Sequence, residues 1–167
     1  SEGEWEDYVT FRKWLLSGED GLKTVYIKFK DQSGKESNSF SASINLDRTP
    51  PEDPEVLMDK NEKYTTNFLR QVQLSLQVKE GDFMMIAGDS TFQGGRWIGF
   101  KETMNYTLYG NEGEKWVYCK FKDKAGNESK IVKDNIILDL VPPSLVSLQI
   151  NNGDKLTNDE KVKITIV

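Results

Sequence analysis

An internal repeat is the feature that most constrains the fold of this chain. The stretches KFKDQSGKESN (28–38) and KFKDKAGNESK (120–130) agree at seven of eleven positions, and Asp31 and Asp123 are separated by 123 − 31 = 92 residues. The same offset aligns two further pairs of segments: GLKTVYIKFKD (21–31) with GEKWVYCKFKD (113–123), and INLDRTPP (44–51) with IILDLVPP (136–143). About fifty residues align without a gap, which is typical of an array of similar small units.

The repeat continues beyond the two Pro-Pro segments, with a change of register. VQLSL (72–76) aligns with VKITI (162–166) at 162 − 72 = 90, a shortening by two residues. We therefore expect three parts, which are the C-terminal half of one module (1–49), a complete module (50–141) and the first strands of a further module (142–167). Adjacent prolines supply no ladder donors and favour extended backbone, which predicts short, stiff linkers between the modules.

Within a module, apolar residues recur at every second position. The alternation runs through VYIKF (25–29) and through VYCKF (117–121), and a period of two predicts strands with one buried face. In the complete module we expect strands at 56–58, 72–78, 83–87, 96–100, 104–109, 116–122 and 131–139. About seven strands in one repeat of this length have the size and spacing of an immunoglobulin-like sandwich. The predicted fold class is all-β, with tandem immunoglobulin-like β-sandwich modules.

Composition excludes several classes of partner. The chain has 167 residues, of which 37% are hydrophobic and 29% charged, and its formal net charge is −5. This mild acidity argues against nucleic acid or an anionic membrane surface as a partner, because both select clustered basic residues. No apolar run approaches the roughly 20 residues of a membrane-spanning helix, and no signal peptide is visible.

The residue types also argue against catalysis. The chain contains no histidine, which removes the commonest general base and the Ser-His-Asp and Cys-His arrangements. Its one cysteine, Cys119, has no partner for an internal disulfide or a thiolate zinc site. Because Cys119 lies on the inward face of its strand, where the first copy has Ile27, we interpret it as a core residue. No nucleophile, base and orienting group come together, so we expect a protein that is not an enzyme.

The repeated KFKD motif predicts a hairpin turn between the last two strands of a module. Asp123 or Asp31 can accept backbone N–H bonds through its carboxylate, and Gly126 or Gly34 can take a positive φ. Ser129 in the same loop, like its counterpart in the first copy, can hydrogen-bond the loop to the strand.

The alternative interpretation of this motif is a calcium site near a module junction. Carboxylate and amide oxygens at Asp123, Asn127, Asp134 and Asp139 are the hard ligands that calcium takes. The spacing is not that of an EF-hand, and the first copy has Lys35 where the second has Asn127. The cofactor is therefore expected to be none, or calcium.

Trp5 and Trp97 recur at the repeat offset, each near a glycine and followed by an aromatic residue. Recurrence at a fixed position favours a packing role, as for a large side chain over a small core. The alternative is an exposed aromatic platform that binds sugar.

The order MMIAGDSTFQGGRWIGF, TLYGNEGEKWVYCKFKDKAGNES and IILDLVPP resembles bacterial immunoglobulin-like repeats of large secreted and surface-anchored proteins. The resemblance covers essentially the whole chain. It implies an extracellular spacer, an adhesin stalk, a filament, a component of an envelope (S-layer) lattice, or an accessory module beside an enzyme. Some relatives bind calcium between modules, which would here point to Asp123 and Asp139, with Asp31 and Asp47 as their equivalents.

We therefore expect a non-enzymatic structural module of a bacterial cell-surface protein, whose partners are copies of itself or adjacent repeats. Two alternatives stay open for the incomplete parts. Residues 142–167 could complete residues 1–49 of the next subunit by donating strands, which builds a head-to-tail fibre, or the sequence is an excerpt from a longer repeat array. The rival function is a glycan- or protein-binding adhesin module that uses Trp97 and Trp5.

Overall fold

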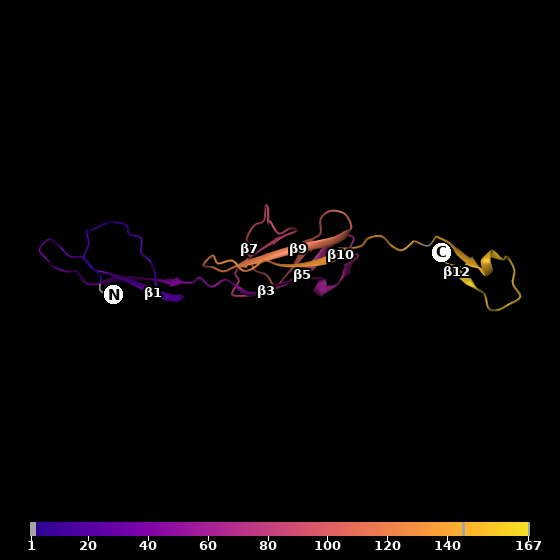
Figure 1. Cartoon of the computed structure of the whole chain (residues 1–167), viewed down its shortest axis with the longest axis horizontal. Coiled ribbons are helices and arrows are strands. Elements are labelled where there is room, and N and C mark those ends of the chain that lie inside the picture. Colours follow the sequence, from indigo (N-terminus) through magenta and orange to yellow (C-terminus); the bar gives the residue numbers. More distant parts are fainter. Residues whose placement is uncertain (1–2, 145, 167) are drawn as a thin grey trace.

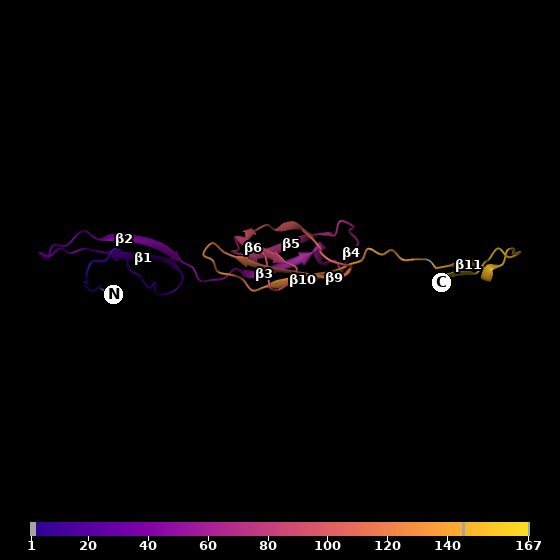
Figure 2. The same cartoon turned by 90° about the horizontal axis from the view of Figure 1, so that it is seen from above.

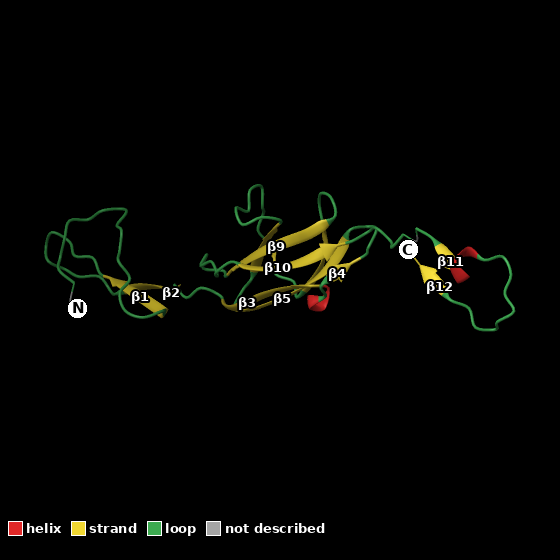
Figure 3. Ribbon diagram, turned by 45° about the vertical axis from the view of Figure 1, so that its right-hand side comes forward, coloured by secondary structure: helices red, strands yellow, loops and turns green. Residues whose placement is uncertain are grey.

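The computed structural model describes residues 3–144 and 146–166. These residues form three bodies that follow one another along the longest axis of the molecule (Figures 1 and 2). Strands and connecting loops make up each body, with two short 3₁₀ turns (Figure 3). The predicted all-β class is thus confirmed.

The first body holds β1 (Gly21–Ile27) and β2 (Phe40–Leu46). The central body holds β3 (Glu52–Met58), the 3₁₀ turn η1 (Asp59–Asn61), β4 (Tyr64–Thr65), β5 (Gln71–Lys79), β6 (Phe83–Ala87), β7 (Ile98–Gly99), β8 (Thr103–Thr107), β9 (Gly113–Lys122) and β10 (Val132–Leu138). The last body holds β11 (Leu148–Ile150), the 3₁₀ turn η2 (Asn151–Gly153) and β12 (Ile164–Ile166).

The central body consists of two sheets that share one apolar core. One sheet has the order β3-β5-β8 and the other β4-β10-β9-β6-β7. The inward positions of β9 alternate with outward ones, as the period of two predicts, so that Val117, Cys119 and Phe121 are fully buried. They pack with residues of the facing strands, among them Met58 and Leu74. The prediction that Cys119 is a core residue is confirmed.

Strand β4 is short but closes one edge of the larger sheet. It pairs in parallel with the end of β10, and the amides of Ile137 and Asp139 donate to the carbonyls of Lys63 and Thr65, both at 3.0 Å. The sheets are also tied to each other, because Asp134 on β10 accepts a hydrogen bond from the Met58 amide of β3 at 2.7 Å. Asp134 therefore has a structural partner.

The first body repeats the pairing of the last two strands of the central body. The β1–β2 register runs from Gly21 opposite Leu46 to Ile27 opposite Phe40. Adding 92 to each number gives the β9–β10 register, from Gly113 opposite Leu138 to Cys119 opposite Val132.

The last body repeats the pairing of β3 and β5 in the same way. Val56 lies opposite Leu76 and Met58 opposite Leu74, while Leu148 lies opposite Ile166 and Ile150 opposite Ile164. Offsets of 92 on β11 and 90 on β12 therefore reproduce the register, which places the two-residue shortening in the loop between these strands. Even the side-chain bond of η1 recurs, because the Gln73 amide donates to Asp59 and the Lys163 amide donates to Asn151, at 2.7 and 2.8 Å.

The seven strands expected in residues 50–141 are all present, and the ends of all but β6 are shifted. Strand β3 begins at Glu52 rather than at residue 56, and the segment expected at 96–100 forms only the short β7. Strand β4 was not anticipated. Val167, at the end of the expected C-terminal strand, lies outside the described residues.

Candidate functional site

The KFKD motif of the central body forms the turn that joins β9 to β10. The Asp123 carboxylate accepts from the amides of Gly126 and Asn127 at 2.7 and 2.9 Å, and Gly126 has a φ of 102°. The Ser129 hydroxyl accepts from the Phe121 amide at 3.0 Å and donates to the Lys130 carbonyl at 2.8 Å. The motif thus holds its own backbone, as the hairpin interpretation predicted.

The turn between β1 and β2 is held by a similar set of internal bonds. Asp31 accepts from the amides of Ser33 and Lys35, both at 2.9 Å, and Ser37 accepts from Phe29 at 3.0 Å. The two stretches differ at four positions, and one of these differences, Lys35 in the first copy and Asn127 in the second, changes a contact with the rest of the chain.

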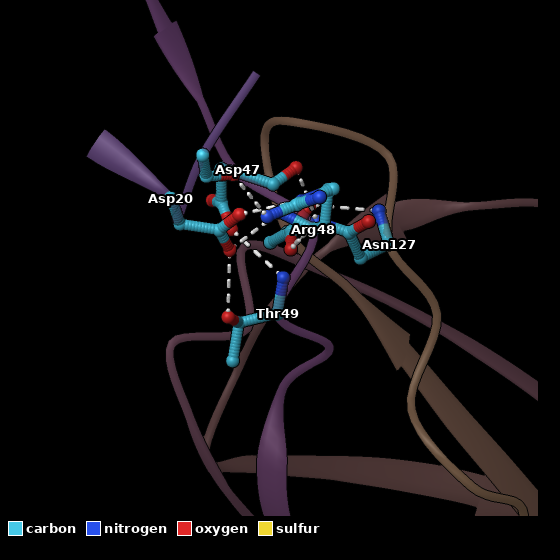
Figure 4. A network of polar contacts seen from close by, with 7 residues as sticks. Asp20, Asp47, Arg48, Thr49 and Asn127 are labelled. Atoms are coloured by element: carbon cyan, nitrogen blue, oxygen red, sulfur yellow. Dashed lines mark hydrogen bonds and ion pairs between the residues drawn. The ribbon is translucent and has the colours of Figure 1, made fainter. Parts of the chain in front are cut away.

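A network of polar contacts lies where the first body meets the central one (Figure 4). The Asp20 carboxylate, which precedes β1, accepts from the Arg48 amide and from Arg48 Nε, both at 2.8 Å, and from the Thr49 hydroxyl at 2.9 Å. Arg48 Nη2 also donates to the Gly18 carbonyl at 3.0 Å. Asp20 thus fixes the linker that follows β2 against the loop that precedes β1. We call Asp20, Asp47, Arg48, Thr49 and Asn127 the junction network.

Asn127 connects this network to the central body. Its Nδ2 donates to the Asp47 carbonyl at 3.2 Å and to Asp123 Oδ2 at 2.9 Å (Figure 4). Because Asn127 belongs to the β9–β10 turn and Asp47 to the linker, the hairpin of one body is bonded to the chain that leaves the other. Lys35 has no amide group with which to repeat this contact.

Asp20 in the network and Asp123 beside it both have a lowered pKa. Hydrogen bonds from the Arg48 amide and side chain, and from Thr49, lower the pKa of Asp20 to about 2. Burial opposes ionisation of Asp123, but the bonds from Asn127 and from the turn amides outweigh it, so that its pKa also lies below the ordinary value.

The second linker repeats the backbone part of the network. The Glu112 side chain accepts from the Leu140 amide at 2.5 Å, as Asp20 does from Arg48, and Asp139 accepts from the Val141 amide at 3.2 Å. The equivalent bond in the first linker joins Asp47 to the Thr49 amide at 3.1 Å. The sequence reasoning missed Asp20, although its offset partner Glu112 is also an acid, a signal that could have identified it.

Of the six residues considered for calcium, the structure brings three together and separates the other three, of which Asp134 accepts from the Met58 amide. Asp47, Asp123 and Asn127 meet at the junction network. Asp31 lies in the β1–β2 turn, and Asp139 follows the opposite end of β10 from Asp123.

The side chains that meet at the junction do not fit a calcium ion. Asn127 turns its Nδ2 toward both oxygen acceptors, and each Asp123 oxygen already accepts an N–H bond. No cluster of three or more acidic or cysteine side chains suited to a metal occurs among the described residues.

Trp97 lies on the outer face of β9 rather than over the core. Lys122 Nζ is 4.3 Å from the centre of its ring and Lys120 Nζ is 5.2 Å away, and both lysines alternate with the buried residues of β9. The equivalent pair in the first body, Lys30 and Trp5, has the same 4.3 Å separation. The expectation that Trp97 packs over the core is therefore wrong, because its ring makes cation–π contacts with Lys120 and Lys122 on the outer face of the sheet.

A second aromatic surface was not anticipated from the sequence. A groove of about 370 Å³ lies between the end of β6 and the β8–β9 region, lined by Tyr106, Tyr109 and Trp116 together with the acids Asp89 and Glu114. Burial raises the pKa of Tyr106 above its ordinary value.

Comparison of the chain with protein-family models gives no match, and comparison with curated proteins gives none. Across residues 3–144 and 146–166, no helix has the length and hydrophobicity needed to cross a membrane.

Proposed function

We propose that this chain is a non-enzymatic structural element built from tandem immunoglobulin-like modules, used as a stalk, filament or lattice component on a bacterial cell surface. The observation that carries the proposal is the junction network, in which a hairpin of one body is bonded to the linker of the preceding one. A contact of this kind suits a protein that holds its modules in line.

The strand order supports the immunoglobulin-like assignment. An antiparallel sandwich of three and five strands, whose early strand β4 pairs in parallel with the last strand β10, has the size and general layout of that fold. The tandem arrangement is supported by contacts that recur at the repeat offset. Tyr8 and Phe29 have ring centres 6.1 Å apart, and their counterparts Phe100 and Phe121 have centres 5.8 Å apart.

Small-angle X-ray scattering of the chain tests this role. A spacer gives an elongated particle whose maximum dimension falls little when the ionic strength rises, because the linkers are short and proline-containing. A compact particle, in which the bodies fold back on one another, contradicts it. The Asn127→Ala variant should broaden the distance distribution, while Lys35→Ala at the equivalent exposed position should leave it unchanged.

The second candidate function is glycan binding, favoured by the groove that Tyr106, Tyr109 and Trp116 line beside Asp89 and Glu114. Aromatic faces stack on sugar rings while carboxylates accept hydroxyl hydrogens, which is the combination that a saccharide site needs. Isothermal titration with cell-wall oligosaccharides tests this function. If an oligosaccharide binds, and binding is lost in Trp116→Ala but kept in Trp97→Ala, the groove is the binding site. If no oligosaccharide gives a heat of binding, the glycan-binding function is wrong.

A further inference from the structure

The first body exposes an apolar face that its counterpart buries. Ile44 and Ile27 are 60% and 52% exposed, whereas the residues at their offset positions, Ile136 and Cys119, are 1% and 0% exposed. The central body shows what covers that face, because β3 and β5 belong to the opposite sheet and share its core. The first body has no such sheet among the described residues.

The last body exposes the complementary face. Leu148 and Ile164 are 56% and 60% exposed, and the equivalent Val56 and Leu74 are 3% and 0% exposed. Strands β11 and β12 pair in the β3–β5 register, so their apolar residues stand in the arrangement that covers β9 and β10 in the central body.

We propose that the β11–β12 pair of one copy of this chain packs on the β1–β2 face of a second copy and completes a sandwich between them. The inference rests on the proposed modular architecture, and it names the partner as a second copy. Burial of large aliphatic side chains on both faces is the driving force.

Hydrogen bonds along the edge of β2 define the register of this contact. In the central body the amides of Ile137 and Asp139 donate to the carbonyls of Lys63 and Thr65. Subtracting 92 from the donors and adding 92 to the acceptors predicts that the Asn45 and Asp47 amides of the second copy donate to the Lys155 and Thr157 carbonyls of the first. No described strand pairs with this edge of β2, because its sheet consists of β1 and β2.

Together the two faces supply four described strands, β1, β2, β11 and β12, whereas the central body has eight. Residues 142–167 correspond to positions 50–77, because 142 − 92 = 50 and 167 − 90 = 77, and residues 1–49 correspond to positions 93–141. No described strand of the outer bodies corresponds to β6 (Phe83–Ala87), so the edge of β1 that matches the β6-bonded edge of β9 has no partner among the described residues. The contact between copies is accordingly weaker than the packing inside the central body, and assembly depends on concentration.

The contact joins two different faces, so it is heterologous and each copy keeps one free face of each kind. Repetition builds an open head-to-tail chain rather than a closed dimer. This geometry makes the test specific, since a copy with one defective face still has the other.

Size-exclusion chromatography with light scattering on the 167-residue chain is the experiment. The wild type should exceed the monomer mass of 19.1 kDa and grow with concentration. Ile44→Asp places a charge on the β1–β2 face and Ile164→Asp on the β11–β12 face, so each variant alone should stay at the monomer mass. An equal mixture should give a particle of twice that mass, because one intact face remains on each variant. Ser41→Asp and Gln149→Asp put the same charge on the opposite faces of β2 and β11 and should assemble like the wild type.

A wild type that stays monomeric at millimolar concentration overturns the proposal, and so does a mixture that stays monomeric. A dimer that Ile164→Asp leaves intact shows that the β1–β2 face packs on itself, which also overturns it. The thermal unfolding of the central body should be the same in all variants, which separates loss of assembly from loss of folding. If the copies do not assemble, the scattering profile expected of a single elongated chain is unchanged. The proposed structural role is therefore tested separately from the assembly.

Discussion

Asn127 donates a hydrogen bond from Nδ2 to the backbone carbonyl of Asp47 at 3.2 Å, between residues 80 positions apart. The same Nδ2 is held by Asp123, so the donor is positioned by its own turn before it reaches the linker. The Asn127 side chain therefore links the central body to the linker that leaves the first body.

Removing this donor should free the linker. In Asn127→Ala the Asp47 carbonyl loses its partner, and we expect trypsin to cut the Arg48–Thr49 bond several times faster than in the wild type, as followed by mass spectrometry. Lys35→Ala is the matched control, because the equivalent position of the first copy makes no such contact. Equal rates for the wild type and Asn127→Ala would mean that the contact does not restrain the linker.

The junction network should loosen only in strong acid. The folded pKa of Asp20 is about 2, below its ordinary value of 3.8, so its stabilising effect is complete above pH 4 and is lost as the pH falls through about 2. In ¹⁵N-edited NMR spectra the Arg48 amide should titrate with a midpoint near 2, and Asp20→Asn should remove that titration. A midpoint near 3.8 would show that Arg48 and Thr49 do not hold the carboxylate.

Ser129→Ala should destabilise the central body. Ser129 is 8% exposed, and its hydroxyl accepts from the buried Phe121 amide. The variant leaves that amide without a partner, at a cost of about 1–3 kcal/mol in the free energy of unfolding. Urea unfolding measures this cost. Ser37→Ala removes the same bond in the first body and should leave the unfolding of the central body unchanged.

Cys119 should be inert in the folded protein. Its side chain is fully buried, and burial raises the pKa of the thiol to about 12. A disulfide reagent at pH 8 should label no thiol in the native chain and one per chain in denaturant. Rapid labelling of the native chain would place Cys119 outside the core. Cys119→Ser should lower the free energy of unfolding by about 1–3 kcal/mol, because a hydroxyl takes the buried position.

Calcium should not stabilise the central body. The Asp123 oxygens are occupied by N–H donors, and an ion at this turn would have to displace them. The melting temperature should therefore be the same in millimolar calcium and in chelator. A rise of several degrees that Asp123→Asn abolishes would restore the calcium interpretation.

The sequence carries most of the information on the strands and little on the junction. Alternating residues such as Val117 and Phe121 identify a strand with one buried face, and the repeat then identifies its copy. Strand β4 has only two residues, too few to show a period, and its existence depends on the parallel edge that β10 offers. Asp20 is polar and lies in a loop, and its role depends on the fold, which brings Arg48 and Thr49 to its carboxylate. Trp97 illustrates the same limit, because its recurrence indicated packing over the core, whereas the ring lies against Lys122 on the outer face of β9.

The parallel pairing of β4 with β10 has a mechanical consequence. Force applied along the chain enters the central body near Glu52 and leaves it after Leu138, and the bonds from Ile137 to Lys63 and from Asp139 to Thr65 lie across that direction. Tension therefore acts on them in shear, so they must break together rather than open one after another from an end. Strand β4, which is too short to be recognised in the sequence, is thus placed to act as a clamp when the molecule is stretched.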